Sequence, residues 1–129
     1  MLLDGAHNPD GAAALAAALA ALHPGRPVEL VFGVLADKDH AGMLRALAPA
    51  VRRLHLVAPV TPRARPAADL HAQARTLGAD ADLHPRLEDA LRCATRAAAD
   101  GALVCVAGSL YLVGEARALL GGGDGSSAR

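Results

Sequence analysis

The sequence contains almost no aromatic residues: of 129 residues, one is Phe, one is Tyr and none is Trp. Any hydrophobic core must therefore be built from Leu, Val and Ala, which supply most of the 53% of residues that are hydrophobic. A chain of this length can bury roughly two thirds of the surface that it exposes when unfolded. We therefore expect one domain with a closely packed aliphatic core.

Excess charge is also absent, because 13 basic and 13 acidic residues give a net charge of zero at pH 7. A neutral chain without a basic cluster gives no reason to expect nucleic acid or a membrane surface as a partner. No stretch has the length of a membrane span, and the first residues lack the basic start and apolar run of a signal peptide. We therefore predict a cytoplasmic protein.

Cysteine is scarce: Cys93 falls in a helical pattern and Cys105 in an apolar strand. Neither has the spacing of a metal site or a redox motif, so we interpret both as buried free thiols in a reducing compartment. Five histidines also lack the spacing typical of metal ligands: His23, His40, His55, His71 and His84. We predict no metal held by this chain.

A phosphate-binding loop of the form Gly-x-x-x-x-Gly-Lys-Ser/Thr is missing as well. Lys38, the only lysine, lies between Asp37 and Asp39. Its ammonium could meet a carboxylate or phosphate of a ligand. The alternative is a solvated loop charge, with Asp39 capping the helix that follows.

Short apolar runs alternate with helical patterns along the rest of the chain. The runs predict strands at residues 1–3, 28–34, 54–57, 81–83 and 102–107. Repeated strand–helix units indicate a mainly parallel sheet with helices on both faces and right-handed crossovers. We therefore predict a Rossmann-like, doubly wound α/β domain over residues 1–120. Residues 121–129, rich in Gly and Ser, are predicted to be a disordered tail.

Two strands carry a prediction about their position in the sheet. Residues 102–107 are six small or branched apolar residues, which favours a central strand. His55 interrupts the apolar run at residues 54–57, which favours a position nearer an edge.

The first strand ends in a turn rich in functional side chains. Asn8 stands at a helix N-cap position, with Pro9 at the first helical position. Such a turn leaves N–H groups at the positive end of a helix dipole, which suits an anion, and Gly5 and Asn8 are expected to form it. The Asp4 carboxylate and the His7 imidazole then lie at the carboxyl end of a strand, where open α/β sheets bind ligands.

The run Asp-Gly-Ala-His-Asn-Pro at residues 4–9 resembles the motif that opens the C-terminal domain of folylpolyglutamate and dihydrofolate synthases, members of the Mur ligase superfamily. Residues 32–39 (Phe-Gly-Val-Leu-Ala-Asp-Lys-Asp) resemble the second loop of that family. Residues 107–117 (Ala-Gly-Ser-Leu-Tyr-Leu-Val-Gly-Glu-Ala-Arg) resemble its last strand–helix junction. The resemblance covers the chain up to about residue 120, although an arginine that the family places just before the first motif is missing.

The resemblance implies a ligase that adds L-glutamate to dihydropteroate or a folate through an acyl phosphate, with ATP and magnesium. The family's triphosphate loop, metal ligands and pteridine site belong to an N-terminal P-loop domain that this sequence lacks. The chain is therefore expected to be a detached C-terminal half that is inactive alone and needs that domain as its partner. Two alternatives stay open: a domain of another Mur-type amino-acid ligase, against which residues 108–112 argue, and a free-standing nucleotide- or amino-acid-binding module without catalysis.

The same resemblance assigns Asp4 and His7 to ATP, and His7, Lys38 and Ser109 to glutamate. Plainer roles exist for three of them: Asp4 could only bond turn N–H groups, His7 could face water, and Ser109 could be an N-cap. No residue is assigned a certain catalytic role, because positioning and charge stabilisation would carry the chemistry.

Three further polar residues are given structural interpretations. Arg63 and Arg65 lie in a Pro-rich loop at residues 58–66 and are interpreted as solvated charges. Tyr111 is interpreted as a packing residue with a wet hydroxyl.

Overall fold

The computed structural model describes residues 1–121. They contain a five-stranded sheet of order β1-β5-β2-β3-β4. The strands are β1 (Leu2–Leu3), β2 (Val28–Phe32), β3 (Arg53–Leu56), β4 (Ala81–Leu83) and β5 (Leu103–Ala107). The helices are α1 (Pro9–Leu22), α2 (His40–Leu47), α3 (Ala67–Thr76), α4 (Leu87–Ala97) and α5 (Leu110–Gly121). Short 3-10 turns, η1 (Ala48–Ala50) and η2 (Ala98–Asp100), follow α2 and α4.

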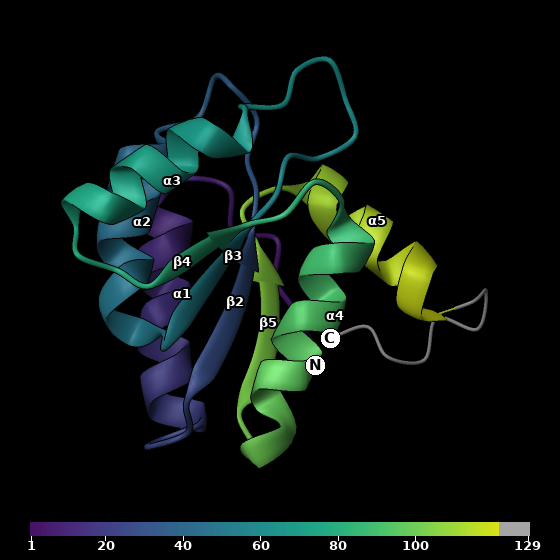
Figure 1. Cartoon of the computed structure of the whole chain (residues 1–129). Helices are drawn as coiled ribbons and strands as arrows, with labels where there is room; N and C mark the ends of the chain where they lie inside the picture. The colour runs from purple at the N-terminus through teal and green to yellow at the C-terminus, as the bar shows by residue number, and fades with distance from the viewer. Residues whose placement is uncertain (122–129) are drawn as a thin grey trace.

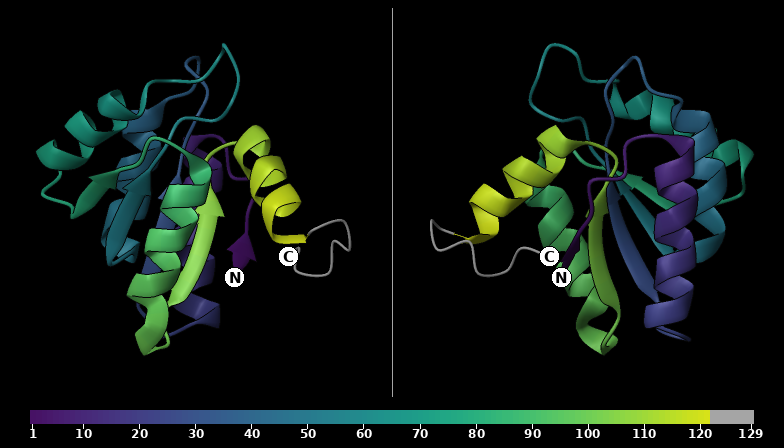
Figure 2. Two further views of the ribbon diagram at one scale, coloured as in Figure 1. Left: turned by 45° about the vertical axis from the view of Figure 1, so that its right-hand side comes forward. Right: turned by 180° about the vertical axis from the view of Figure 1, so that it is seen from behind.

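The helices cover both faces of the sheet. Helices α1, α2 and α3 pack on one face, and α4 and α5 pack on the other (Figures 1 and 2). Every pairing between the described strands is parallel. The predicted doubly wound α/β fold is therefore confirmed.

The core is aliphatic, as the scarcity of aromatic residues required. Strands β2 and β5 are buried at every position, as expected for parallel strands covered on both faces. The single phenylalanine, Phe32, is fully buried among the Leu, Val, Ala and Met side chains beneath α1–α3. A second aliphatic cluster lies beneath α4 and α5.

The strand positions refine two predictions. Strand β5 is interior, between β1 and β2, but the middle strand is β2. Strand β3 is second from the β4 edge and is paired on both sides, and His55 on it is fully buried. A polar side chain is accommodated there because a buried carboxylate accepts its hydrogen bond.

Helix α5 includes Gly121, the first residue of the predicted tail. The rest of the predicted tail, residues 122–129, lies outside the described residues.

Two loop side chains act as helix N-caps: the amide of Asn8, as predicted, and the carboxylate of Asp39, as in the alternative given for its loop. Asn8 Oδ1 accepts a hydrogen bond from the backbone N–H of Gly11 at 2.7 Å, with Pro9 as the first residue of α1. Asp39 Oδ1 accepts one from the N–H of Gly42 at 2.9 Å at the start of α2. These caps fix the loops that leave β1 and β2.

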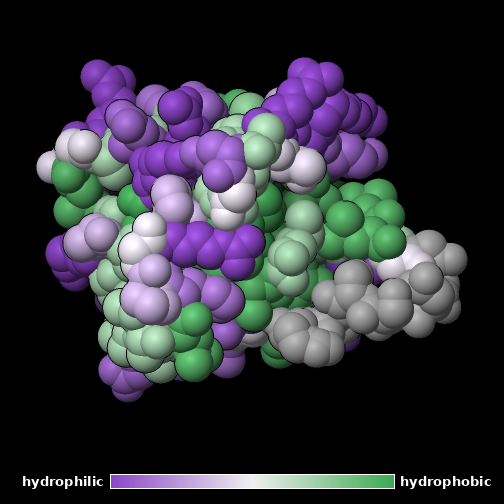
Figure 3. Space-filling model, turned by 90° about the horizontal axis from the view of Figure 1, so that it is seen from below, coloured by the Kyte–Doolittle hydropathy of each residue, from purple (hydrophilic) through white to green (hydrophobic). Residues whose placement is uncertain are grey.

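Apolar surface gathers on the α5 side of the molecule, to the right in Figure 3. Leu110, Leu119 and Leu120 of α5 are all exposed large hydrophobic side chains. Within residues 1–121, no helix is both long enough and apolar enough to cross a membrane.

Candidate functional site

A cavity of about 260 Å³ opens at the carboxyl ends of β1, β2 and β5. Its lining residues are His7, Leu35, Lys38, Arg63, Gly108, Ser109, Leu110 and Tyr111. Three predicted site residues thus come together: His7, Lys38 and Ser109, from the loops after β1, β2 and β5. Residues distant in the sequence meet because parallel strands end at one edge of the sheet.

The turn after β1 uses its own side chains to hold its shape. Asp4 Oδ1 accepts a hydrogen bond from the N–H of Ala6 at 2.8 Å. His7 Nδ1 lies 3.0 Å from the carbonyl oxygen of Gly5, and because a carbonyl can only accept, Nδ1 donates. The other ring nitrogen, Nε2, stays available for a ligand.

Not every predicted residue lines the cavity. Asp4, Gly5 and Asn8 instead line a second hollow, of about 460 Å³, beside α1, and His7 belongs to both. Asp4, assigned to ATP, and Lys38 and Ser109, assigned to glutamate, therefore line two different cavities. His7 lines both of them.

Ser109 is buried at the start of α5, with only 2% of its surface exposed. Its Oγ accepts a hydrogen bond from the N–H of Tyr111 at 3.0 Å, and its carbonyl accepts one from Val113 at 3.0 Å. Ser109 is therefore an N-cap, as its plainer role required. Its hydroxyl hydrogen can still donate to a ligand, because the capping bond uses only an oxygen lone pair.

Two glycines let the loops after β2 and β5 approach closely. Gly108 has a φ of +114°, and a Cβ there would collide with the carbonyl oxygen of Gly33. A Cβ at Gly33 would in turn collide with the carbonyl oxygen of Val57. The backbone therefore packs directly on backbone where the chain leaves β2, β3 and β5, next to Gly108 of the cavity lining.

The loop at residues 58–66 is drawn to the cavity by pairing with the loop after β2. The N–H of Ala36 donates to the carbonyl of Arg63 at 2.7 Å, and the N–H of Arg65 donates to Val34 at 2.9 Å. This pairing puts the Arg63 side chain in the cavity lining, 4.0 Å from Asp37. The predicted solvated charge is confirmed, because the Arg63 side chain is 60% exposed. No local pattern signals the loop pairing that also brings Arg63 to the cavity.

Arg65 is not the solvated charge that was predicted. Its side chain is only 23% exposed, and it donates to the carbonyl of Ala36 and pairs with Asp69 at 3.5 Å. Tyr111 is 47% exposed and lines the cavity, so it does not pack in the core.

The electrostatics of the cavity favour an anion. Lys38 and Arg63 are both cationic, and no carboxylate is among the lining residues. The start of α5 adds N–H groups at the positive end of a helix. Mg²⁺ takes carboxylate, phosphate and water oxygens in octahedral geometry, so these residues do not fit a magnesium site.

Residues 1–110 match the protein family described as "Mur ligase, glutamate ligase domain". The chain belongs to this family. Its identity to the folylpolyglutamate synthase of Lacticaseibacillus casei is 38% over 124 residues, covering 95% of this chain and 27% of that protein.

Solved structures agree with this membership. A folylpolyglutamate synthase of Mycobacterium tuberculosis complexed with ADP and AMPPCP has a TM-score of 0.83 and 34% identity, covering 92% of this chain and 29% of that one. A bifunctional folylpolyglutamate/dihydrofolate synthase with Mn, AMPPNP and L-glutamate bound has a TM-score of 0.81 and 33% identity, covering 92% and 28%. This Mur ligase domain therefore spans under a third of the length of these relatives and is homologous to their C-terminal region.

The Mur ligase domain also holds a buried polar network far from the cavity. The Glu29 carboxylate, 1% exposed, accepts hydrogen bonds from Arg52 Nε at 2.6 Å and His55 Nε2 at 2.8 Å. His55 Nδ1 lies 3.2 Å from His84 Nε2, and the two rings stack. The spacing of the histidines along the sequence hid this pairing, because the parallel pairing of β3 and β4 creates it.

The two cysteines differ more than predicted. Cys105 is buried in β5, and burial raises the pKa of its thiol to about 12, so it stays protonated. Cys93 on α4 is only partly buried, so its predicted full burial is wrong.

Proposed function

We propose that this Mur ligase domain positions L-glutamate and part of the nucleotide in an ATP-dependent ligase that adds glutamate to dihydropteroate or a folate. The observation that carries the proposal is the convergence of His7, Lys38 and Ser109 on one anion-favouring cavity. Relatives named folylpolyglutamate synthase, one with L-glutamate bound, support the substrate class.

The proposed reaction forms an amide in two steps. The γ-phosphoryl group of ATP passes to a carboxylate oxygen of the acceptor, which gives an acyl phosphate and ADP. The amino nitrogen of glutamate, once it has lost a proton, attacks the acyl carbon. The carbon–oxygen bond to phosphate breaks, inorganic phosphate leaves, and the nitrogen loses a second proton.

Four of the cavity residues have proposed tasks in holding glutamate. Lys38 and Arg63 balance its two carboxylates, and the Ser109 hydroxyl and the start of α5 donate hydrogen bonds to one of them. His7 lines both this cavity and the hollow of Asp4, and its free Nε2 would meet a phosphate or a carboxylate. Asp4 keeps one oxygen beyond its turn bond for a nucleotide hydroxyl.

The domain is proposed to need a separate P-loop domain. This sequence has no lysine after a glycine-rich loop, and the cavity lacks the carboxylates that magnesium takes. A P-loop domain would supply the triphosphate loop and the metal ligands, and this domain would close over it. Its contribution is then orientation and charge stabilisation.

The test is ATP- and glutamate-dependent phosphate release with a pteroate or folate acceptor. We expect none from the 129-residue chain alone and clear release when a family member's N-terminal P-loop domain is added. Turnover by the chain alone would contradict the need for that domain. Glutamate binding without any turnover in the mixture would favour the free-standing binding module.

Variants then separate glutamate positioning from folding. Lys38→Ala is expected to weaken glutamate binding at least about tenfold, since it removes a charge-assisted contact, whereas Lys38→Arg keeps much of it. His7→Ala is compared with His23→Ala, a matched histidine outside the cavity. Equal binding by all four variants in an NMR titration with glutamate would contradict the assignment.

A further inference from the structure

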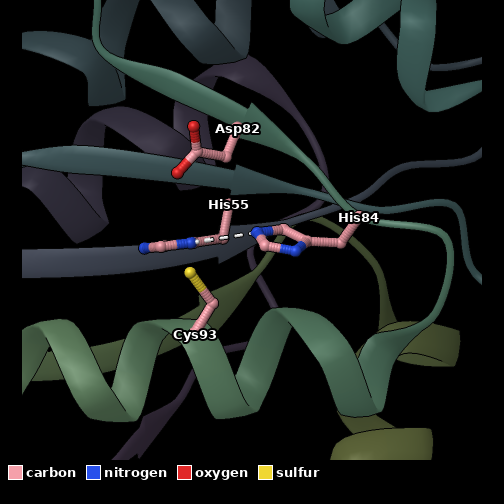
Figure 4. Close-up of side chains that lie close together, drawn as sticks. All are labelled: His55, Asp82, His84 and Cys93. Atoms are coloured by element: carbon pink, nitrogen blue, oxygen red, sulfur yellow. Dashed lines mark hydrogen bonds between the residues drawn. The ribbon is translucent and has the colours of Figure 1, made fainter.

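Four metal-ligating side chains meet on the α4 side of the sheet. His55 comes from β3, Asp82 from β4, His84 from just beyond β4, and Cys93 from α4, which packs over them (Figure 4). One ligand atom from each lies within 4.8 Å of the others. We propose that these residues form a binding site for one transition-metal ion, with Zn²⁺ as the preferred ion.

The spacing of the nitrogen atoms fits one tetrahedral ion. His55 Nδ1 and His84 Nε2 lie 3.2 Å apart. Two nitrogens that each lie about 2.0–2.1 Å from a tetrahedral Zn²⁺ are about 3.3 Å from one another. The separation of the two nitrogens therefore suits bonds to one metal ion, once the rings turn their lone pairs from one another toward it.

The donor set selects the class of ion. Two imidazoles, one thiolate and one carboxylate suit Zn²⁺, whereas Mg²⁺ and Ca²⁺ take only oxygen ligands. Four protein ligands would also close the coordination sphere, which is typical of a structural site. The site would then connect β3, β4 and α4 rather than activate water.

A neighbouring carboxylate already orients the buried ligand. Glu29 can only accept, so His55 Nε2 donates to it, and the other ring nitrogen, Nδ1, faces His84 and is the one that would bind a metal. Metal-bound histidines commonly donate their second nitrogen to a carboxylate in this way. The arrangement holds without a metal because Arg52 also pairs with Glu29.

The other ligands are arranged for entry of an ion. Asp82 pairs with Arg53 through Oδ2 at 3.3 Å, which leaves its second oxygen for a metal. Asp82, His84 and Cys93 are only partly buried, so an ion can reach them from solvent.

This site is independent of the proposed ligase function. The cavity lies at the carboxyl ends of β1, β5 and β2. The four proposed metal ligands lie on β3, β4 and α4, toward the β4 edge of the sheet. Loss of metal binding therefore leaves the glutamate cavity untouched, and each proposal can fail alone.

The first experiment titrates the untagged full chain with Co²⁺, then displaces it with Zn²⁺. We expect one equivalent to bind, with the intense visible bands of tetrahedral Co²⁺ and a thiolate-to-cobalt charge-transfer band, and Zn²⁺ to abolish both. Cys93→Ser should remove the charge-transfer band, and His84→Ala should weaken binding at least about tenfold, whereas Cys105→Ala and His71→Ala should do neither. Octahedral spectra, or equal binding by all four variants, would overturn the proposal.

A second measurement needs no variant. The chain has two cysteines, so the alkylation of Cys93 can be followed against the buried Cys105 as an internal reference. Saturating Zn²⁺ should slow alkylation of Cys93 at least about tenfold, because a coordinated thiolate is shielded. An unchanged alkylation rate at saturating Zn²⁺ would overturn the proposal even if the variants misfold.

Discussion

The cavity lies at the carboxyl ends of the strands, the Glu29 network lies within the sheet beneath α4, and the two are built in different ways. The cavity is made by loops: turn N–H groups, a helix start and half-exposed cations at the ends of β1, β2 and β5. The network is made by side chains that project from the middle of β2 and β3 and are covered by α4. The comparison indicates that this fold can position polar groups in two ways: by backbone geometry at strand ends, and by buried side chains beneath a helix.

The two regions should respond differently to substitution. A loop side chain that reaches into solvent can be removed with little effect on folding, whereas removal of a buried carboxylate leaves the buried donor that it bonded without a partner. The predictions below compare the two regions, beginning with the largest effect.

Glu29→Ala is expected to lower the free energy of unfolding by about 2–3 kcal/mol, because it leaves the buried Nε2–H of His55 without an acceptor, whereas Arg52 keeps its pair with Asp100. Chemical denaturation without added metal measures the loss. Asp37→Ala is the matched control from the cavity region, since its pair with Arg63 is 4.0 Å long and more than half exposed. Its effect should stay below about 0.5 kcal/mol, and equal losses in the two variants would remove the distinction between the regions.

The second prediction concerns how well the folded protein excludes water from the Cys105 thiol on β5. An unfolded thiol has a pKa near 8.5, and burial raises the pKa of Cys105 to about 12. Between these values the unfolded chain loses a proton that the folded chain keeps, so stability falls as pH rises, by about 1.4 kcal/mol per pH unit.

At pH 10 this component amounts to about 2 kcal/mol relative to pH 8.5. It is measured as the difference between the parent chain and Cys105→Ala, each unfolded at several pH values. The variant should show the shallower decline. Parallel curves would mean that water reaches Cys105 in the folded state.

Asn8→Ala should show the smallest effect, a loss of about 1 kcal/mol, because it removes the 2.7 Å hydrogen bond that caps α1. Asn8→Ser, which can also cap, should retain most of the stability. Thermal unfolding of the three proteins provides the measurement. A loss as large as that of Glu29→Ala would show that the cavity turn is as essential to folding as the buried network.

Local sequence patterns predicted the features that depend on residues close together in the chain, such as turns and helix caps. The turn at Asp4 and the caps at Asn8 and Asp39 involve residues two or three positions apart, so their chemistry is legible in the chain. The alternation of apolar runs and helical stripes likewise predicted the doubly wound sheet. The convergence of His7, Lys38 and Ser109 followed from the resemblance and the shared edge of parallel strands.

Features that depend on register or loop pairing were not predictable. Glu29 and His55 are 26 positions apart, and His55 and His84 are 29 apart. Only the pairing of β2, β3 and β4 makes them neighbours. Arg63 entered the cavity through the bridge between Leu35 and Ala64, which no periodicity announces.

The contact between Gly33 and Gly108 has a mechanical consequence. With no side chain between them, the loop that carries Lys38 and the junction that carries Ser109 rest directly on one another. Because their backbones are in direct contact, we expect the two segments to move together as one rigid unit. Any adjustment of the cavity to a ligand would then have to come from another part of its lining, such as the loop that carries Arg63.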